Sequence, residues 1–138
     1  MTAPLTPGQV NEFVAEVYPS WFADGTRCVE LGDGMAMVRW PFQAAELRPG
    51  GYISGPRMFS AADGALWFAT FTIVGLEAMA VTSEMSIRFV RPARDGDLMA
   101  RAVLNSVGSR RLVGTVELWI DGAPERPVAI AQGSYARP

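Results

Sequence analysis

Apolar residues follow two different periods along this chain, and the change of period separates its helices from its strands. Between Thr6-Pro7 and Pro19 they recur at helical spacing, at Val10, Phe13, Val14 and Val17. Proline suits both the first turn of a helix and the position just beyond its end. This pattern predicts a short amphipathic helix that packs against the edge of a sheet.

Six segments of mostly alternating or short apolar character, bounded by turn residues, predict strands. They span residues 27–31, 35–40, 81–90, 98–107, 111–120 and 128–135. Gly32-Asp33-Gly34 joins the first two as a hairpin would, and Pro92 stops the third. Because short turns favour antiparallel pairing, we expect an antiparallel sheet.

A long apolar stretch from Met58 to Leu76 interrupts the strands after an irregular segment, residues 41–55. Its length raises the possibility of a membrane span, but Asp63, Gly64 and three hydroxyl residues argue against one, as does the lack of flanking positive charge. We expect a buried central helix with Pro56 in its first turn and Gly75 at its end. The fold class is therefore α+β, one domain of residues 1–138 with a sheet wrapped around a helix.

Composition narrows the possible partners. The chain has 138 residues, a net charge of −2 and a pI near 5.1, and its arginines are dispersed, so neither nucleic acid nor a membrane surface is an expected partner. The single cysteine, Cys28, cannot form an internal disulfide, and the N-terminal residues lack a signal-peptide pattern. The expected location is the cytoplasm.

The absence of histidine limits the chemistry. Nucleophile systems that depend on histidine are excluded, and one cysteine without histidine gives no adequate zinc-ligand set, so no metal site is expected. The chain has no lysine for a Schiff base, and Gly50-Gly51 is too short for a dinucleotide motif. Acid–base work falls to carboxylates. Asp63, the only formal charge between Arg57 and Glu77, is the candidate.

Several short motifs follow one another from Pro49 onward. They are Pro49, Gly51 and Gly55 before the long helix, Asp63 within it, Phe89-Val90-Arg91-Pro92 at a strand end, then Gly96-Asp97 and Gly108-Ser109-Arg110-Arg111. In this order they resemble the hot-dog-fold acyl-CoA thioesterases, in particular the branch related to the phenylacetate-pathway thioesterase. The chain departs from that family at Arg48, Ser54 and Pro56, where the family often has asparagine, histidine and a second glycine.

The resemblance implies hydrolysis of an acyl-CoA thioester, with coenzyme A entering only as part of the substrate and no separate cofactor. Asp63 falls at the position of the family's catalytic carboxylate, as general base or nucleophile, while the Gly55 N–H would polarise the carbonyl and Ser54 would assist. The resemblance also implies a homodimer or homotetramer, which the exposed sheet edge supports independently. Expected substrate-binding residues are Arg48, Gly51, Thr82, Ser83, Arg91, Arg110 and Arg111.

Each of these residues also has a purely structural interpretation. Asp63 could accept backbone hydrogen bonds, Gly51 and Gly55 could be turn glycines, Ser54 could cap the helix, and the arginines could be solvated. Two other function classes stay open. One is a non-catalytic acyl-CoA-binding or regulatory protein; the other, hydratase chemistry on the same fold, ranks last because it normally uses a histidine. The acyl group itself is not predicted.

Overall fold

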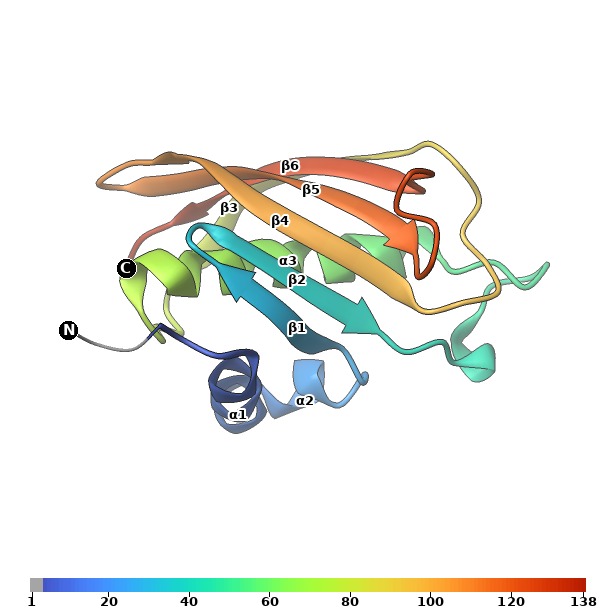
Figure 1. Ribbon diagram of the computed structural model, residues 1–138, viewed down its shortest axis with the longest axis horizontal. Coiled ribbons are helices and arrows are strands. Elements are labelled where there is room, and N and C mark those ends of the chain that lie inside the picture. The colour runs from blue at the N-terminus through green and yellow to red at the C-terminus, as the bar shows by residue number, and fades with distance from the viewer. Residues whose placement is uncertain (1–3) are drawn as a thin grey trace.

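The computed structural model describes residues 4–138, which form one antiparallel sheet around a long helix (Figure 1). The helices are α1 (Pro7–Val17), α2 (Pro19–Phe22), the 3-10 turn η1 (Ala44–Glu46) and α3 (Gly55–Val74). The strands are β1 (Arg27–Gly32), β2 (Met35–Trp40), β3 (Val81–Phe89), β4 (Leu98–Val107), β5 (Arg111–Ile120) and β6 (Ala129–Ala136). All six predicted strands and the long helix are confirmed, with ends shifted by a residue or less.

The strand order β1-β2-β4-β5-β6-β3 leaves β1 and β3 at the two edges of the sheet. Every pair is antiparallel, as the sequence predicts. The hairpins β1–β2, β4–β5 and β5–β6 join neighbours in the chain, whereas β3 pairs with β6 at the far end of the sequence. This long-range pairing brings the C-terminal strand next to the segment that follows α3.

The ends of α3 are set by the residues at its caps. The Ser54 hydroxyl accepts a hydrogen bond from the Arg57 N–H at 3.2 Å, and Pro56 occupies the first turn, where its missing N–H has no cost. Gly75, with φ of 85°, ends the helix in a conformation that suits glycine. Between these caps, Leu66, Phe68 and Phe71 are almost fully buried under the sheet. No helix within residues 4–138 is long and apolar enough to cross a membrane.

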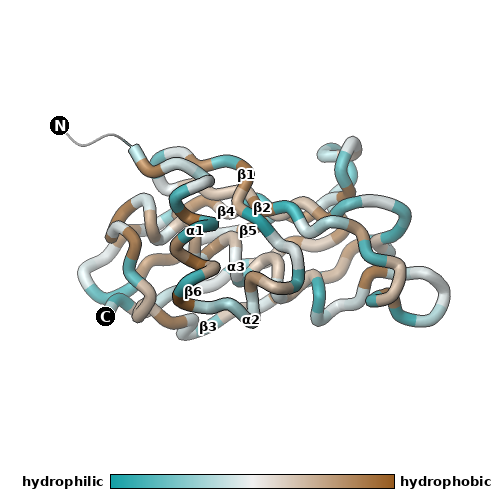
Figure 2. The backbone as a smooth tube through the Cα atoms, turned by 90° about the horizontal axis from the view of Figure 1, so that it is seen from below, coloured by the Kyte–Doolittle hydropathy of each residue, from teal (hydrophilic) through white to brown (hydrophobic). Residues whose placement is uncertain are grey.

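The N-terminal segment differs from its prediction in one respect. Thr6 and Gln9 form a capping box that starts α1, and Asn11 exchanges hydrogen bonds with the N–H and carbonyl of Cys28 on edge strand β1. Helix α1 therefore packs at the sheet edge, as predicted. Pro19, however, also starts a second helix, α2, because proline is well suited to a first helical position. Both helices lie below the sheet in Figure 1 and face the viewer in Figure 2.

Candidate active site

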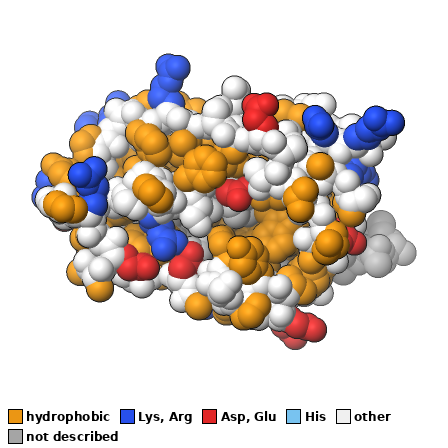
Figure 3. All heavy atoms as spheres, turned by 180° about the vertical axis from the view of Figure 1, so that it is seen from behind, with side chains coloured by type: hydrophobic (Ala, Val, Ile, Leu, Met, Phe, Trp, Pro, Cys, Tyr) orange, Lys and Arg blue, Asp and Glu red, His pale blue; other side chains and the backbone are white. Residues whose placement is uncertain are grey.

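A cavity of about 930 Å³ opens between α3, β3 and the α1–α2 segment. Figure 3 shows the face opposite that of Figure 1, on which hydrophobic side chains gather around a hollow. We call this space the main cavity. Its lining includes Val17, Tyr18, Trp21, Gly55, Pro56, Phe59, Ser60, Asp63, Gly64, Trp67, Thr82, Ile87, Phe89 and Tyr135. Among the described residues of that lining, Asp63 is the only one with a charged side chain.

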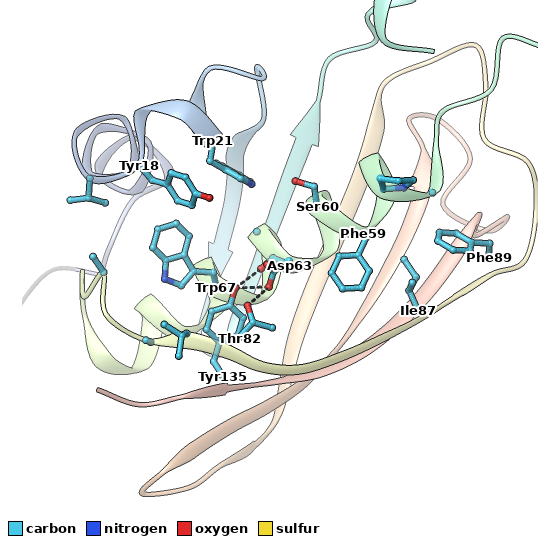
Figure 4. Close-up of a pocket in the computed structure, with 17 residues that line it drawn as sticks. Tyr18, Trp21, Phe59, Ser60, Asp63, Trp67, Thr82, Ile87, Phe89 and Tyr135 are labelled. Carbon is cyan, nitrogen blue, oxygen red and sulfur yellow. Dashed lines mark hydrogen bonds between the residues drawn. The ribbon is translucent and has the colours of Figure 1, made fainter. Parts of the chain in front are cut away.

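Asp63 is held in the main cavity by two hydroxyl groups from the sheet. Its Oδ1 accepts hydrogen bonds from Thr82 Oγ1 at 2.8 Å and from Tyr135 Oη at 2.6 Å, and the same tyrosine lies 3.1 Å from the Asp63 carbonyl oxygen. Figure 4 shows both side chains pointing at the carboxylate from neighbouring strands. Within residues 4–138 no group donates to Asp63 Oδ2, which leaves that oxygen available to a ligand.

Tyr135 is a functional candidate that sequence reasoning missed. The ring is buried, with 4% exposure, on the inward face of β6. Burial raises the pKa of Tyr135 well above its usual range, and the nearby charge of Asp63 raises it further. The phenol therefore stays protonated and serves as a donor. Its only signal in the sequence is a polar atom at an inward position of a predicted strand.

Gly55 lies at the other end of the main cavity, at the start of α3. Its N–H has no acceptor within residues 4–138, as expected for the first residue of a helix. A Cβ placed on Gly55 would lie 3.2 Å from the Phe89 ring, so a larger residue would be crowded here. The positive end of the helix dipole makes this N–H suited to a developing negative charge.

Gly55 and Asp63 do not meet within one chain. They are eight residues apart in α3, which corresponds to about 12 Å along the helix axis. A reacting carbonyl must lie about 3 Å from each group. One chain therefore cannot bring both to the same carbonyl.

Comparison with known proteins identifies the family. The family model described as thioesterase superfamily matches residues 50–125, more than half of the chain. The chain belongs to the thioesterase superfamily. No curated protein is similar enough to this chain to count as a match.

Solved structures agree with this family. A putative thioesterase from Silicibacter sp. TM1040 is 32% identical, with a TM-score of 0.88 over 100% of this chain and 95% of its own. A conserved protein from Pseudomonas aeruginosa is 31% identical, with a TM-score of 0.79 over 91% and 96%. The PaaI protein of the E. coli phenylacetic acid degradation operon is 26% identical, with a TM-score of 0.81 over 96% and 93%. This superfamily member thus has the predicted hot-dog fold of PaaI-like type.

The structure brings some of the sequence-predicted site residues of this thioesterase-superfamily chain together. Gly55, Asp63 and Thr82 line the main cavity, and Arg48 and Arg91 line an adjoining hollow of about 660 Å³ that also reaches Gly55. Gly51, with φ of 80°, lies in the turn beside Arg48. The Ser54 hydroxyl, predicted to assist catalysis, accepts the Arg57 N–H as a helix cap.

Three predicted binding residues lie away from the main cavity. Ser83 Oγ is 2.6 Å from Ser134 Oγ, a contact made on β6 and not with Asp63. Arg111 lines a separate hollow over β5 and β6, and Arg110 lies in the preceding β4–β5 turn. Their roles in binding stay predictions, and within one chain none of the three lines the main cavity with Asp63.

The Gly96-Asp97 motif has a structural role in this chain. Asp97 accepts the Phe42 N–H at 2.8 Å and pairs with Arg39 Nη1 at 2.8 Å, which joins the segment after β2 to the start of β4. The Phe42 N–H, and next the Arg39 guanidinium, hold the pKa of Asp97 below its usual range. The motif therefore joins two segments of the fold, and neither Gly96 nor Asp97 lines the main cavity.

Proposed function

We propose that this chain hydrolyses acyl-CoA thioesters with Asp63 as the general base or nucleophile. The observation that carries the proposal is the carboxylate itself: Asp63 lies in an apolar cavity, is held through Oδ1 by Thr82 and Tyr135, and keeps Oδ2 free. A carboxylate fixed by one oxygen keeps the other available for a reacting group. Membership of the thioesterase superfamily supports the reaction type.

Asp63 can act in two ways that share one outcome. As a general base, Oδ2 takes a proton from water while the water oxygen bonds to the thioester carbon; as a nucleophile, Oδ2 bonds to that carbon and water later hydrolyses the anhydride. In both routes the carbonyl oxygen becomes negative, the C–S bond breaks, and coenzyme A leaves as a thiolate that takes up a proton. Because a thiolate is a good leaving group, the absence of histidine does not prevent the reaction.

The Gly55 N–H is the proposed donor to the oxyanion, and the spacing in α3 requires it to come from a second copy of the chain. A site completed by two chains would place the Gly55 of one beside the Asp63 of the other. The edge strand β3 supports such pairing because, within residues 4–138, no strand pairs with its outer side, and it exposes Val81 and Phe89, which are 57% and 49% accessible. The proposed assembly is thus a homodimer or a higher oligomer built on it.

Positive charge near the start of α3 supports coenzyme A as the leaving group. Arg48 and Arg91 border the hollow that adjoins the main cavity, and neither forms an ion pair within residues 4–138. Arg91 donates to the Pro127 carbonyl at 2.8 Å, which holds it near that hollow. Guanidinium groups placed in this way suit the phosphates of coenzyme A.

The test is hydrolysis of a panel of short, medium, long and aromatic acyl-CoAs, followed by detection of the released thiol. We expect turnover of at least one member by the parent and its loss in Asp63→Asn. If several members bind and none is hydrolysed, a non-catalytic acyl-CoA-binding protein becomes the better interpretation. If Asp63→Asn hydrolyses acyl-CoA as fast as the parent, the proposed role of Asp63 is rejected, while the proposed thioesterase activity stands.

A further inference from the structure

One end of the main cavity is lined by aromatic residues, some of which come from the α1–α2 segment and not from the long helix or the sheet. On one side of Asp63 lie Tyr18, Trp21 and Trp67, and on the other lie Phe59 and Phe89 (Figure 4). Tyr18 and Trp21 belong to the α1–α2 segment, outside residues 50–125 that the family model matches. This end of the cavity therefore depends on a part of the chain that lies outside the match to the family model.

Trp21 is fixed in place by its contact with α3. Its ring packs so closely on Gly64 that a Cβ there would lie 2.9 Å from Cη2 and nearer still to Cζ2. Its edge-to-face contact with Phe68, at 5.4 Å between ring centroids, holds it further. Trp21 and Asp63 both line the main cavity, so the indole is held in the same cavity as the carboxylate. A fixed ring in that position limits how far a bound group can extend.

Tyr18 and Trp67 continue the same wall. Their rings meet edge to face at 6.3 Å, and Trp67 is only 8% exposed. The small residues Ala78 and Ala80, from the segment that leads into β3, complete the lining there. Except for the Tyr18 hydroxyl and the Trp21 and Trp67 indole nitrogens, these side chains are apolar and suit an acyl group more than the polar body of coenzyme A.

We propose that Trp21, with Tyr18, forms the end wall of the acyl-binding part of the cavity and limits the length of the acyl group. The inference rests on the proposed thioesterase activity, which requires the thioester carbon to lie at Asp63. From that point the apolar acyl chain runs towards Tyr18, Trp21 and Trp67. A chain longer than this space meets the indole of Trp21.

The experiment measures kcat/KM for hydrolysis of hexanoyl- and dodecanoyl-CoA by the parent and by Trp21→Ala. We expect the ratio of kcat/KM for dodecanoyl to that for hexanoyl to rise about tenfold or more in the variant, the lower end of what one mismatched methylene contributes. Phe22→Ala is the matched control, since Phe22 is an aromatic residue of the same helix that stacks on Arg27 and does not line the main cavity. Its ratio should stay at the parental value.

Trp21→Leu replaces Trp21→Ala if the latter fails to fold. If the parent hydrolyses neither substrate, the proposed activity fails. The end wall is then tested by calorimetric binding of non-hydrolysable hexanoyl and dodecanoyl thioether analogues of the substrate. We expect Trp21→Ala to shift the binding preference towards the dodecanoyl analogue. An unchanged preference in folded Trp21 variants, or an equal change in Phe22→Ala, would overturn the proposal.

Discussion

Tyr135 donates a hydrogen bond to Asp63 across 72 positions of sequence, at 2.6 Å between Oη and Oδ1. The contact exists because β6 lies beside β3 in the sheet and places its inward side chains above α3. Thr82, which opposes Tyr135 in the β3–β6 register, donates to the same oxygen. One oxygen of the carboxylate thus accepts both hydrogen bonds, and within residues 4–138 the other accepts none.

Removing the Tyr135 hydroxyl should reduce catalysis through Asp63. In Tyr135→Phe the carboxylate loses a donor, so we expect kcat to fall roughly tenfold, with KM little changed, as fits the loss of one hydrogen bond to a charged group. In an Asp63→Asn background the same change should cause no further loss. The measurement is steady-state hydrolysis by all four proteins of this cycle. Independent, additive losses would show that Tyr135 does not act through Asp63.

Asp63→Asn separates a catalytic carboxylate from a structural one. The amide keeps an oxygen that accepts from Thr82 and Tyr135, so we expect the thermal midpoint and oligomer size to stay near the parental values. Turnover should fall roughly 100-fold or more, within the usual range for a general base. All three quantities are measured on one preparation. If the variant has a lower thermal midpoint but parental turnover per folded molecule, the role of Asp63 is structural and not catalytic.

The long helix was predictable because its own residues specify it. Pro56 and Gly75 mark its ends, and the apolar stretch from Met58 to Val74 has one charge, so both its existence and its burial follow from local sequence. The same is true of the hairpins, whose turns lie beside the strands they join. Asp63 could be chosen as a candidate for the same reason: a lone carboxylate in an apolar helix requires compensation.

The partners of Asp63 could not be predicted in this way. Tyr135 and Thr82 reach it only through the pairing of β3 with β6, and no local pattern states which strand lies beside which. Trp21 was missed for a different reason. Pro19 ends one helical pattern, but it also starts α2, and four residues are too few to show a period.

Cys28 should be unreactive in the folded protein. Its side chain is 3% exposed, and burial raises the pKa of the thiol to about 12, so almost none is thiolate at pH 8. We expect very slow reaction with a disulfide reagent under native conditions and complete reaction after unfolding in guanidinium chloride. Rapid stoichiometric labelling of the native protein would show that β1 opens readily at this edge.

The Asp97 carboxylate should make the free energy of unfolding depend on pH in the acid range. Because the folded state lowers the pKa of Asp97 from its ordinary value of 3.8, the contribution to the free energy of unfolding is present above that value and is lost as pH falls through the folded pKa. Asp97→Asn should therefore lower the free energy of unfolding by about 0.5–1 kcal/mol at pH 7, as for a partly exposed ion pair. Urea unfolding should show this difference shrinking below about pH 3.8.

Asp95→Asn is the matched control for that measurement. Asp95 lies in the same loop with φ of 63°, a conformation that asparagine tolerates, and its pair with Arg94 is exposed. We expect little change in the free energy of unfolding at any pH. A difference between Asp97→Asn and the parent that persists unchanged to pH 2 would mean that the charge of Asp97 is not what stabilises the fold.

The close packing of Trp21 on Gly64 predicts that Gly64→Ala lowers the free energy of unfolding in the parent but raises it when Trp21 is replaced by alanine. In the parent, Gly64→Ala pushes a methyl group into the indole, so we expect the free energy of unfolding to fall by about 1–3 kcal/mol, as for overpacking elsewhere. In a Trp21→Ala background that obstacle is gone, and the better helix propensity of alanine should raise the free energy of unfolding by up to about 1 kcal/mol. Denaturant unfolding of the four proteins measures both effects. If Gly64→Ala destabilises equally in both backgrounds, the constraint at position 64 does not come from Trp21, and the indole is not held against α3 at Gly64.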